Sequence, residues 1–480
     1  MLFNSFEFAL FLPIVFLLYW FVFSKSLKVQ NFFILVVSYV FYGWWDWRFL
    51  SLIAFSSAVD YLCALKIQDS SKEQNRKLFL WISMAINLGF LGVFKYFNFF
   101  TESFADLLKV IGFNVNPYTL NFILPVGISF YTFQTMSYTI DVYRKQLNAS
   151  NDIVSFFAYV SFFPQLVAGP IERAINLLPQ FNVKRKFSYK VGSDGMMLIL
   201  WGLFKKIVIA DNCAVYVNYA FENYETASGI ELILGAVFFA FQIYGDFSGY
   251  SDIALGCAKL LGFELMVNFK TPYFSRDMAE FWRRWHISLS TWFRDYLYIP
   301  LGGSKGRKSI AIRNTIIIFL VSGFWHGANW TFIVWGALNA LYFLPLLLFR
   351  KNRENLNVAA ENSCFPSIKE FFQILLTFSL TCLSWIYFRS IDVNNANNYI
   401  ISIFENQFFE KKLFSIEYFI LFMLILFFLM IEWANRLNGF NFTIYKIKYR
   451  ILKIAFLIFI ALQIFLFGLF EKVNFIYFQF

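Results

Sequence analysis

Long apolar segments, separated by short polar and basic segments, recur along the chain from residue 6 to residue 470. Many of them approach the roughly 20 residues that a helix needs to cross a bilayer. Only helices and closed barrels satisfy the backbone in lipid, and the sequence lacks the alternating ten-residue pattern of an outer-membrane barrel. The pattern therefore predicts an all-α, polytopic integral membrane protein with a single membrane domain over residues 1–480.

Lysine and arginine in the polar segments set the predicted topology, because cytoplasmic loops are enriched in these residues. Simple spans are predicted near residues 6–23, 29–46, 49–65, 78–98, 119–140, 193–217, 231–261, 370–388, 413–435 and 451–470. We interpret 153–170 as a re-entrant segment or hairpin and 270–310 as a cytoplasmic, interfacial segment. The stretch 311–349 is interpreted as two short spans, broken at Gly323 and Gly327. The sum is about 11–12 transmembrane helices with both termini extracytoplasmic.

Composition agrees with this class of protein. The chain is 59% hydrophobic and 22% aromatic, and its mean hydropathy is +0.57. The net charge of +11 fits basic cytoplasmic loops, so we expect membrane lipids and not nucleic acid as partners. The five cysteines show no C-x-x-C spacing, and the sequence predicts no metal site.

The chain has only two histidines, and each lies in an aromatic motif. His286 belongs to FWRRWHISLS at 281–290, and His326 belongs to SGFWHGANW at 322–330. An ionisable group kept in apolar surroundings is a candidate functional site, and imidazole transfers protons near neutral pH. We assign both as candidate catalytic residues. The alternatives are a packed histidine at a helix break for His326, and an anchor of the interfacial segment for His286.

Further polar motifs accompany the histidines, namely PVGISFYTFQ at 125–134, FFPQLVAGPIER at 162–173 and YGDFSGYSD at 244–252. Together the motifs resemble the membrane-bound O-acyltransferase family from about residue 5 to beyond residue 345. The sequences of these motifs are similar to those of the family branch that O-acetylates alginate and peptidoglycan. The resemblance implies helices around a central tunnel. It also implies that His326 matches the essential histidine of the family and His286 its second histidine.

The resemblance implies acetyl-CoA as acyl donor, with no permanently bound cofactor. The candidate donor-binding residues are Arg283, Arg284, Arg294, Trp285 and Asn329. Arginine binds phosphates through paired hydrogen bonds, but the same arginines also fit the role of cytoplasmic anchors. Asp246 and Asp252 either pair with arginines or touch substrate, and Lys205 and Lys206 either snorkel or bind the donor.

The chain ends in FIYFQF, within a predicted extracytoplasmic tail over 471–480. The spacing Phe-x-Tyr-x-x-Phe resembles a C-terminal motif of these envelope-acylation systems, whose tyrosine is a proposed acyl carrier. Tyr477 is therefore a third candidate catalytic residue. Because a phenol has a pKa near 10, its attack on a thioester needs a general base. The alternative for Tyr477 is an aromatic belt at the end of the last helix.

These features predict a multi-pass O-acyltransferase of the bacterial cytoplasmic (inner) membrane. It would take acetyl from cytoplasmic acetyl-CoA and pass it through Tyr477 to an extracytoplasmic polysaccharide O-acetyltransferase partner. Peptidoglycan or an exopolysaccharide such as alginate would be modified. Two alternatives stay open. One is a D-alanyl or longer-chain acyltransferase of the same family. The other is a secondary transporter or channel, since broken helices with buried polar residues also mark transport sites.

Overall fold

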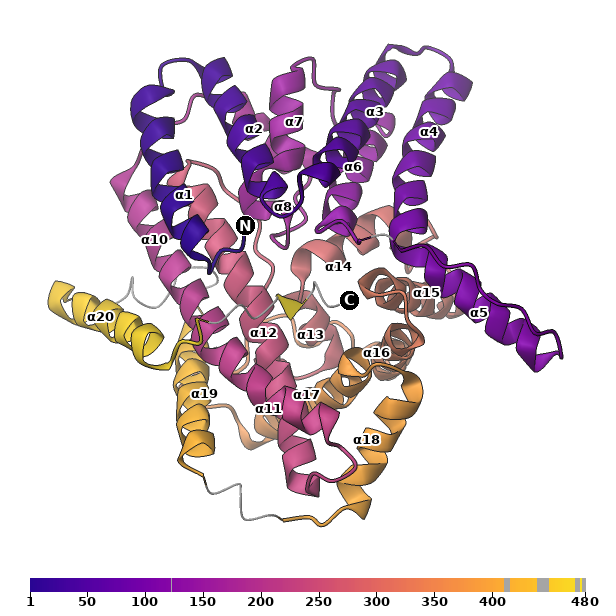
Figure 1. Ribbon diagram of the computed structural model, residues 1–480, viewed down its shortest axis with the longest axis vertical. Coiled ribbons are helices and arrows are strands. Elements are labelled where there is room, and N and C mark those ends of the chain that lie inside the picture. The colour runs from indigo at the N-terminus through magenta and orange to yellow at the C-terminus, as the bar shows by residue number, and fades with distance from the viewer. Residues whose placement is uncertain (122, 410–414, 438–448, 471–474, 477–480) are drawn as a thin grey trace. The chain divides into compact units, whose positions relative to one another are not determined.

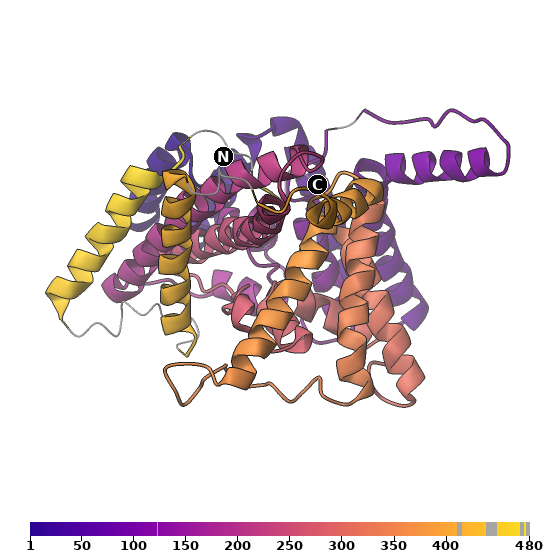
Figure 2. The same cartoon turned by 90° about the horizontal axis from the view of Figure 1, so that it is seen from below.

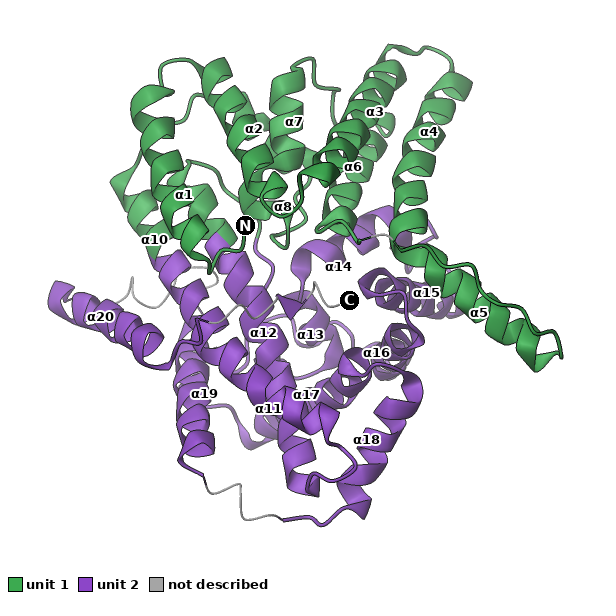
Figure 3. Ribbon diagram, in the orientation of Figure 1, with its two compact units in different colours: residues 1–196, 254–266 green, residues 197–253, 267–480 purple. Residues whose placement is uncertain are grey.

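The computed structural model describes residues 1–121, 123–409, 415–437, 449–470 and 475–476, which form helices and loops (Figure 1). The chain divides into two compact units, coloured separately in Figure 3. Unit 1 comprises Met1–Met196 and Ala254–Met266, and unit 2 comprises Met197–Ile253 and Val267–Phe480. Helices α10 (Tyr189–Leu203) and α12 (Gly229–Leu260) supply residues to both units.

Unit 1 otherwise consists of α1 (Phe6–Leu17), η1 (Leu18–Val22), α2 (Leu27–Gly43), η2 (Trp47–Phe49), α3 (Leu50–Asp69), α4 (Glu73–Leu91), η3 (Gly92–Tyr96), α5 (Phe97–Val110), α6 (Ile128–Tyr143), α7 (Ile153–Ser161), α8 (Phe163–Leu166) and α9 (Ala174–Phe181). Its core is largely apolar, and some of the polar groups buried in it bond to one another. Asp60 of α3, for example, accepts hydrogen bonds from Ser83 Oγ (2.5 Å) and from Asn87 Nδ2 (2.9 and 3.0 Å). Partners of this kind offset the cost of burying a carboxyl group.

Unit 2 otherwise consists of η4 (Phe204–Ala210), α11 (Asp211–Glu222), η5 (Pro272–Phe274), α13 (Met278–Arg284), α14 (Ile287–Phe293), η6 (Arg294–Tyr298), α15 (Lys308–His326), α16 (Trp330–Leu348), α17 (Ile368–Arg389), α18 (Val393–Glu405), α19 (Ile416–Asn435) and α20 (Arg450–Phe467). Both histidines lie in this unit. Polar residues cap the N-termini of several of its helices. In α17, Ser367 and Glu370 form a reciprocal capping box, which satisfies exposed amides of the first turn.

Eight helical segments in the described residues are long and apolar enough to cross a membrane, which confirms the all-α, polytopic class. They are Trp47–Asp69, Glu73–Val110, Gly229–Leu260, Lys308–His326, Trp330–Leu348, Ile368–Arg389, Ile416–Asn435 and Arg450–Phe467. Two shorter apolar helices, Phe6–Val22 and Leu27–Gly43, coincide with the first two predicted spans. The described helices that meet these criteria are thus fewer than the 11–12 transmembrane helices predicted.

The largest correction concerns the predicted span 119–140. Helix α6 begins only at Ile128, and the described residues of the predicted span before it, 119–121 and 123–127, form no helix. Pro125 has no N–H to donate, and Gly127 takes a left-handed φ of 73°. A Cβ at Gly127 would lie 2.7 Å from the carbonyl oxygen of Leu166. The backbone turn at this point excludes a straight helix, although the hydropathy of the segment is continuous.

Other predicted spans differ in length. The span 78–98 extends to the 38-residue segment Glu73–Val110, whose last part, α5, leads away from the other helices of unit 1 (Figures 1 and 2). The span 193–217 is divided among α10, the π-helical turn η4 and α11. Within 153–170, α7 and α8 have 9 and 4 residues, too few to cross a bilayer. That this segment is re-entrant stays a prediction.

Candidate active site

Helices α15 and α16 form the hairpin that positions His326. The predicted break is present at Gly327, because α15 ends at His326 and α16 begins at Trp330. The break expected at Gly323 is wrong, because Gly323 lies inside α15, and each helix has 19 residues, so neither is short. Glycines let the helices approach closely. A Cβ at Gly323 would lie 2.2 Å from the Phe332 carbonyl oxygen, and a Cβ at Gly327 would lie 2.0 Å from the Phe332 ring. His326 is therefore held at the end of a helix packed tightly against its neighbour.

His286 occupies the corner between α13 and α14, where it precedes α14 as the N-cap residue with a left-handed φ of 42°. Such a φ is uncommon for a residue other than glycine and persists only where the surroundings hold it. Asn268 supplies that support. Its carbonyl oxygen accepts the Ile287 amide at 2.9 Å, and its Oδ1 accepts the Ser288 hydroxyl at 2.6 Å. The corner thus directs the His286 ring inward.

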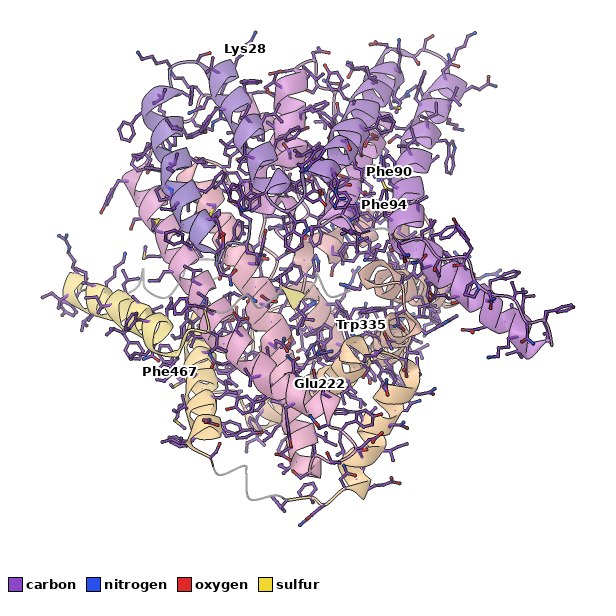
Figure 4. The ribbon with its side chains drawn as sticks, in the orientation of Figure 1. Lys28, Phe90, Phe94, Glu222, Trp335 and Phe467 are labelled. Carbon is purple, nitrogen blue, oxygen red and sulfur yellow. The ribbon has the colours of Figure 1, made fainter. Side chains whose placement is uncertain are left out.

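The fold brings the two histidines together, with ring centroids 6.4 Å apart. Both side chains are buried, and His286 is 1% exposed and His326 5%. Aromatic rings surround them. His326 lies 5.1 Å from Trp335 of α16, a residue labelled in Figure 4, and His286 lies 4.7 Å from Phe247 of α12. Two residues 40 positions apart in the sequence therefore share one apolar site.

A cavity of about 260 Å³ opens beside this pair, and both histidines line it. Its wall is mostly apolar, with Trp282 and Phe319 among the lining residues, and Ser290 and Ser322 add hydroxyls. This composition is typical of small-molecule sites, which are largely hydrophobic with a few placed polar groups. At this size, near the low end of such sites, the cavity can hold a short acyl group and the end of its donor.

The cavity also reaches a basic residue that sequence reasoning did not select for the site. Arg353, which follows α16 and enters the predicted topology only as a cytoplasmic basic residue, lines it together with Asn352. Nothing in the linear sequence separates Arg353 from the neighbouring basic residues Arg350 and Lys351. The tertiary structure separates them, because the chain after α16 turns back and brings Arg353 to the wall of the histidine cavity.

Burial affects the chemistry of His286. It disfavours the imidazolium form and lowers the pKa of His286 from its ordinary value of 6.5 to about 3. His286 is therefore neutral near pH 7. A neutral imidazole can donate one hydrogen bond and accept another, which suits it to orienting a substrate.

Lowering the pH from 7 to 4 is expected to destabilise the protein through His286. The folded-state pKa of about 3 lies below the ordinary 6.5, so the unfolded chain binds the proton first. The contribution is complete above pH 6.5 and is lost as the pH falls toward 3, by at most about 1.4 kcal/mol per pH unit. Thermal midpoints measured from pH 7 to 4 should fall less steeply for His286→Gln than for the natural chain. Equal slopes would contradict this assignment.

The five candidate donor-binding residues lie outside the set that lines the cavity. Arg284 donates to Glu280 Oε1 at 2.7 Å, and Arg283 donates to backbone carbonyl oxygens of the 350–366 loop. Arg294 is exposed and pairs with its neighbour Asp295 at 2.6 Å. Their role in donor binding stays a prediction.

The two uncharged candidates have structural contacts. Trp285 is 1% exposed and packs in the aromatic core of unit 2, with its ring 5.2 Å from that of Trp385. Asn329 caps α16 by accepting the Thr331 amide at 3.0 Å and donates to the Ile391 carbonyl oxygen at 2.7 Å. Both residues support the walls around the histidines, and a direct contact with the donor stays a prediction for each.

Buried ion pairs account for the charged residues of the YGDFSGYSD motif. The expected pairing with arginines is wrong, because both aspartates bind lysines of η4. Asp252 binds Lys205 Nζ at 2.6 Å, and Asp246 binds Lys206 Nζ at 2.9 Å. Lys206 also binds Asp211, at 2.8 Å. The π-helical turn presents consecutive lysines to α12, an arrangement that the hydropathy pattern does not reveal.

The C-terminal motif is described only in part. Phe475 and Ile476 belong to unit 2, whereas Tyr477, the candidate acyl carrier, lies outside the described residues. Of the predicted tail 471–480, only these two residues can be placed.

Comparison with known proteins places this fold and histidine pair among membrane-bound acyltransferases. The profile of MBOAT, the membrane-bound O-acyltransferase family, matches residues 144–390, which include both histidines. The chain belongs to this family, and it is therefore a multi-pass membrane O-acyltransferase. The transporter or channel interpretation is replaced by that of an enzyme.

Three curated relatives illustrate the range of similarity. The probable alginate O-acetylase AlgI of Azotobacter vinelandii is 39% identical over 82% of this chain and 76% of its own length. The peptidoglycan O-acetyltransferase of Helicobacter pylori is 35% identical over 82% of this chain and 78% of its own length. The teichoic acid D-alanyltransferase of Streptococcus thermophilus is 29% identical over 60% of this chain and 75% of its own length.

Proposed function

We propose that this enzyme takes acetyl from acetyl-CoA at the cytoplasmic face of the bacterial inner membrane and passes it outward for O-acetylation of a cell-envelope polysaccharide. Tyr477 receives the acetyl group, and an extracytoplasmic O-acetyltransferase partner moves it onto peptidoglycan or an exopolysaccharide such as alginate. Both termini lie on the extracytoplasmic side. The relatives that act on alginate and peptidoglycan support the class of acceptor.

The observation that carries this proposal is the meeting of both histidines at one cavity. His326 acts as general base and accepts the proton of the acceptor hydroxyl. The oxygen attacks the thioester carbonyl, the C–S bond breaks, and the thiolate of coenzyme A takes up the proton. A general base works best with a pKa near the operating pH. Because burial lowers the pKa of His286 to about 3, His286 is poorly matched to a base near neutral pH and is proposed to orient the reacting groups.

The two ends of the relay follow from the chemistry of the groups. Acetyl-CoA carries phosphate charges that do not cross lipid, whereas an acetyl group is small and neutral and can be passed through the protein. Arg353, at the histidine cavity, is suited to the phosphates of the donor because a guanidinium binds phosphate through paired hydrogen bonds. A phenyl ester on Tyr477 has a better leaving group than an alkyl ester, so it keeps enough transfer potential to acetylate a sugar hydroxyl.

The direct test incubates the purified, full-length protein with acetyl-CoA labelled in the acetyl group and maps the label by peptide mass spectrometry. Label is expected on Tyr477, and it should be lost in His326→Ala. Label on another residue would contradict the carrier assignment. Turnover of acetyl-CoA without any covalent label would indicate direct transfer to the acceptor.

Replacing the tyrosine is expected to stop the relay while leaving the fold intact. Tyr477→Phe removes only the phenol oxygen, so polysaccharide acetylation in cells should fall to background. The matched control is Tyr449→Phe, which removes the same atom from a tyrosine that is 66% exposed before α20. Acetate released from the isolated polysaccharide by mild base measures both variants. Full acetylation with Tyr477→Phe would exclude the carrier role.

A D-alanyl or longer acyl donor remains a second candidate, because a teichoic acid D-alanyltransferase is among the relatives. The cavity of about 260 Å³ accepts a short acyl group without separating acetyl from alanyl. Competition distinguishes them. Unlabelled acetyl-CoA should displace labelled acetyl-CoA, whereas a D-alanyl carrier protein or a long-chain acyl-CoA should not.

A further inference from the structure

Phe475 and Ile476, the last described residues, are buried in unit 2, within the same aromatic cluster as the histidines. Phe475 is 2% exposed and Ile476 is 1% exposed. The Phe475 ring lies 5.1 Å from Tyr250 and 6.2 Å from Phe247, and the Phe247 ring in turn lies 4.7 Å from His286. A continuous chain of ring contacts therefore connects the terminal segment to the candidate active site.

A carboxylate holds the backbone of this segment. The Ile476 amide donates to Asp246 Oδ2 at 2.7 Å, while Asp246 Oδ1 binds Lys206 Nζ at 2.9 Å. Lys206 Nζ also binds Asp211 Oδ1 at 2.8 Å. This cluster contains two carboxylates and one ammonium group, so a further hydrogen-bond donor is favourable. The Ile476 amide supplies it, and hydrogen bonds to a charged acceptor are stronger than neutral ones.

The anchor depends little on side-chain identity. Asp246 accepts a backbone N–H, which any residue except proline provides. The side chains of Phe475 and Ile476 add apolar burial on either side of this bond. The buried side chains of Phe475 and Ile476 therefore select this segment, and the hydrogen bond from the Ile476 amide to Asp246 holds it in place.

We propose that Asp246 is a positioning residue that docks the C-terminal segment beside the histidine pair. Because Tyr477 is covalently bonded to Ile476, docking brings the candidate carrier to the site where the acetyl group arrives. The docking stands on its own, whereas its use in acyl transfer rests on the proposed function. In this proposal the Lys206–Asp246–Asp211 cluster acts through the C-terminal segment that it holds.

Hydrogen–deuterium exchange of the full-length protein in detergent tests the docking. Asp246→Asn is compared with Asp252→Asn, its matched control on the same helix, which pairs with the adjacent lysine. The Ile476 amide donates to Asp246 and not to Asp252. The Ile476 amide should exchange about 10-fold faster in Asp246→Asn and within about 2-fold of the natural rate in Asp252→Asn. Exchange in the natural protein at the rate of an unstructured peptide would overturn the docking, as would an unchanged rate in Asp246→Asn.

A second pair of variants leaves the buried ion pairs untouched. Ile476→Pro removes the amide donor, whereas Ile476→Ala trims the side chain and keeps the donor. With labelled acetyl-CoA, Tyr477 should acquire label about 10-fold more slowly in the proline variant than in the alanine variant, because the acceptor is no longer held in place. Equal rates would overturn the positioning role. Release of the Ile476 amide by Asp246→Asn, with no label on Tyr477 in any variant, would uphold docking and refute the carrier.

Discussion

The variant His326→Ala is expected to lower the acyl-transfer rate by about 10²- to 10⁴-fold, the usual contribution of a positioned general base. Without the imidazole, the acceptor hydroxyl must lose its proton to water in a site built of aromatic rings. The Michaelis constant for acetyl-CoA should change little, since Arg353, the proposed contact for the donor phosphates, is unchanged. Single-turnover release of coenzyme A from purified protein measures the chemical step directly.

Two further variants distinguish the loss of a general base from the loss of the folded structure. His326→Gln keeps a polar side chain of similar reach but no basic nitrogen, so it should be nearly as slow as His326→Ala. His286→Gln should be impaired less, because His286 orients groups and does not take the proton. Both variants should elute as the natural protein does in size exclusion and unfold within a few degrees of it. A fully active His326→Ala enzyme would exclude the base assignment.

The second large effect is structural and concerns Glu280 in α13. This carboxylate is 1% exposed and binds two guanidinium groups, Arg284 Nη2 at 2.7 Å and Arg276 Nε at 3.1 Å. Glu280→Gln removes the carboxylate that pairs with Arg284 and leaves Arg276 with Glu370 alone, at 3.2 Å. Removing one partner of a buried ion pair typically costs about 3–5 kcal/mol. The thermal midpoint should fall by several degrees. Transfer activity should fall with it, because α13 leads directly into His286.

The matched control is Asp295→Asn. Asp295 also binds an arginine, Arg294, at 2.6 Å, but the Arg294 side chain is 58% exposed. Exposed pairs contribute about 0–1 kcal/mol, so the thermal midpoint should barely move. Equal shifts in Glu280→Gln and Asp295→Asn would show that α13 does not depend on its buried ion pairs.

Hydropathy predicted the class of fold well, because the cost of unsatisfied backbone in lipid leaves few alternatives. The helix break at Gly327 was predicted from the glycine itself. Both histidines were selected as candidate site residues because they are the only two in the chain. The predicted span 119–140 shows what hydropathy alone does not predict, namely the residue at which a helix begins. That segment has apolar residues along its whole length, interspersed with polar ones such as Gln134, but Pro125 and the left-handed Gly127 prevent the helix from starting before Ile128. Backbone geometry decided the outcome there.

The site itself was predicted less completely, because arginine serves phosphates and carboxylates equally well in a linear sequence. Arg284 lies in a motif beside His286, yet its partner is Glu280, four residues before it. Arg353 appeared to be an ordinary loop residue, yet it lines the histidine cavity. Likewise, the partners of Asp246 are supplied by η4 and by the last residues of the chain. Long-range contacts of this kind leave no local pattern.

The α15–α16 hairpin has a consequence for how the protein is made. Only residues 327–329 separate its two helices, so its close glycine contacts join segments that leave the ribosome in immediate succession. Contacts between near neighbours in sequence form faster than distant ones. We expect the pair to associate soon after membrane insertion and to set the place of His326 early. Phe475 and Ile476 are synthesised later, and Ile476 then binds Asp246 of a helix that is already complete.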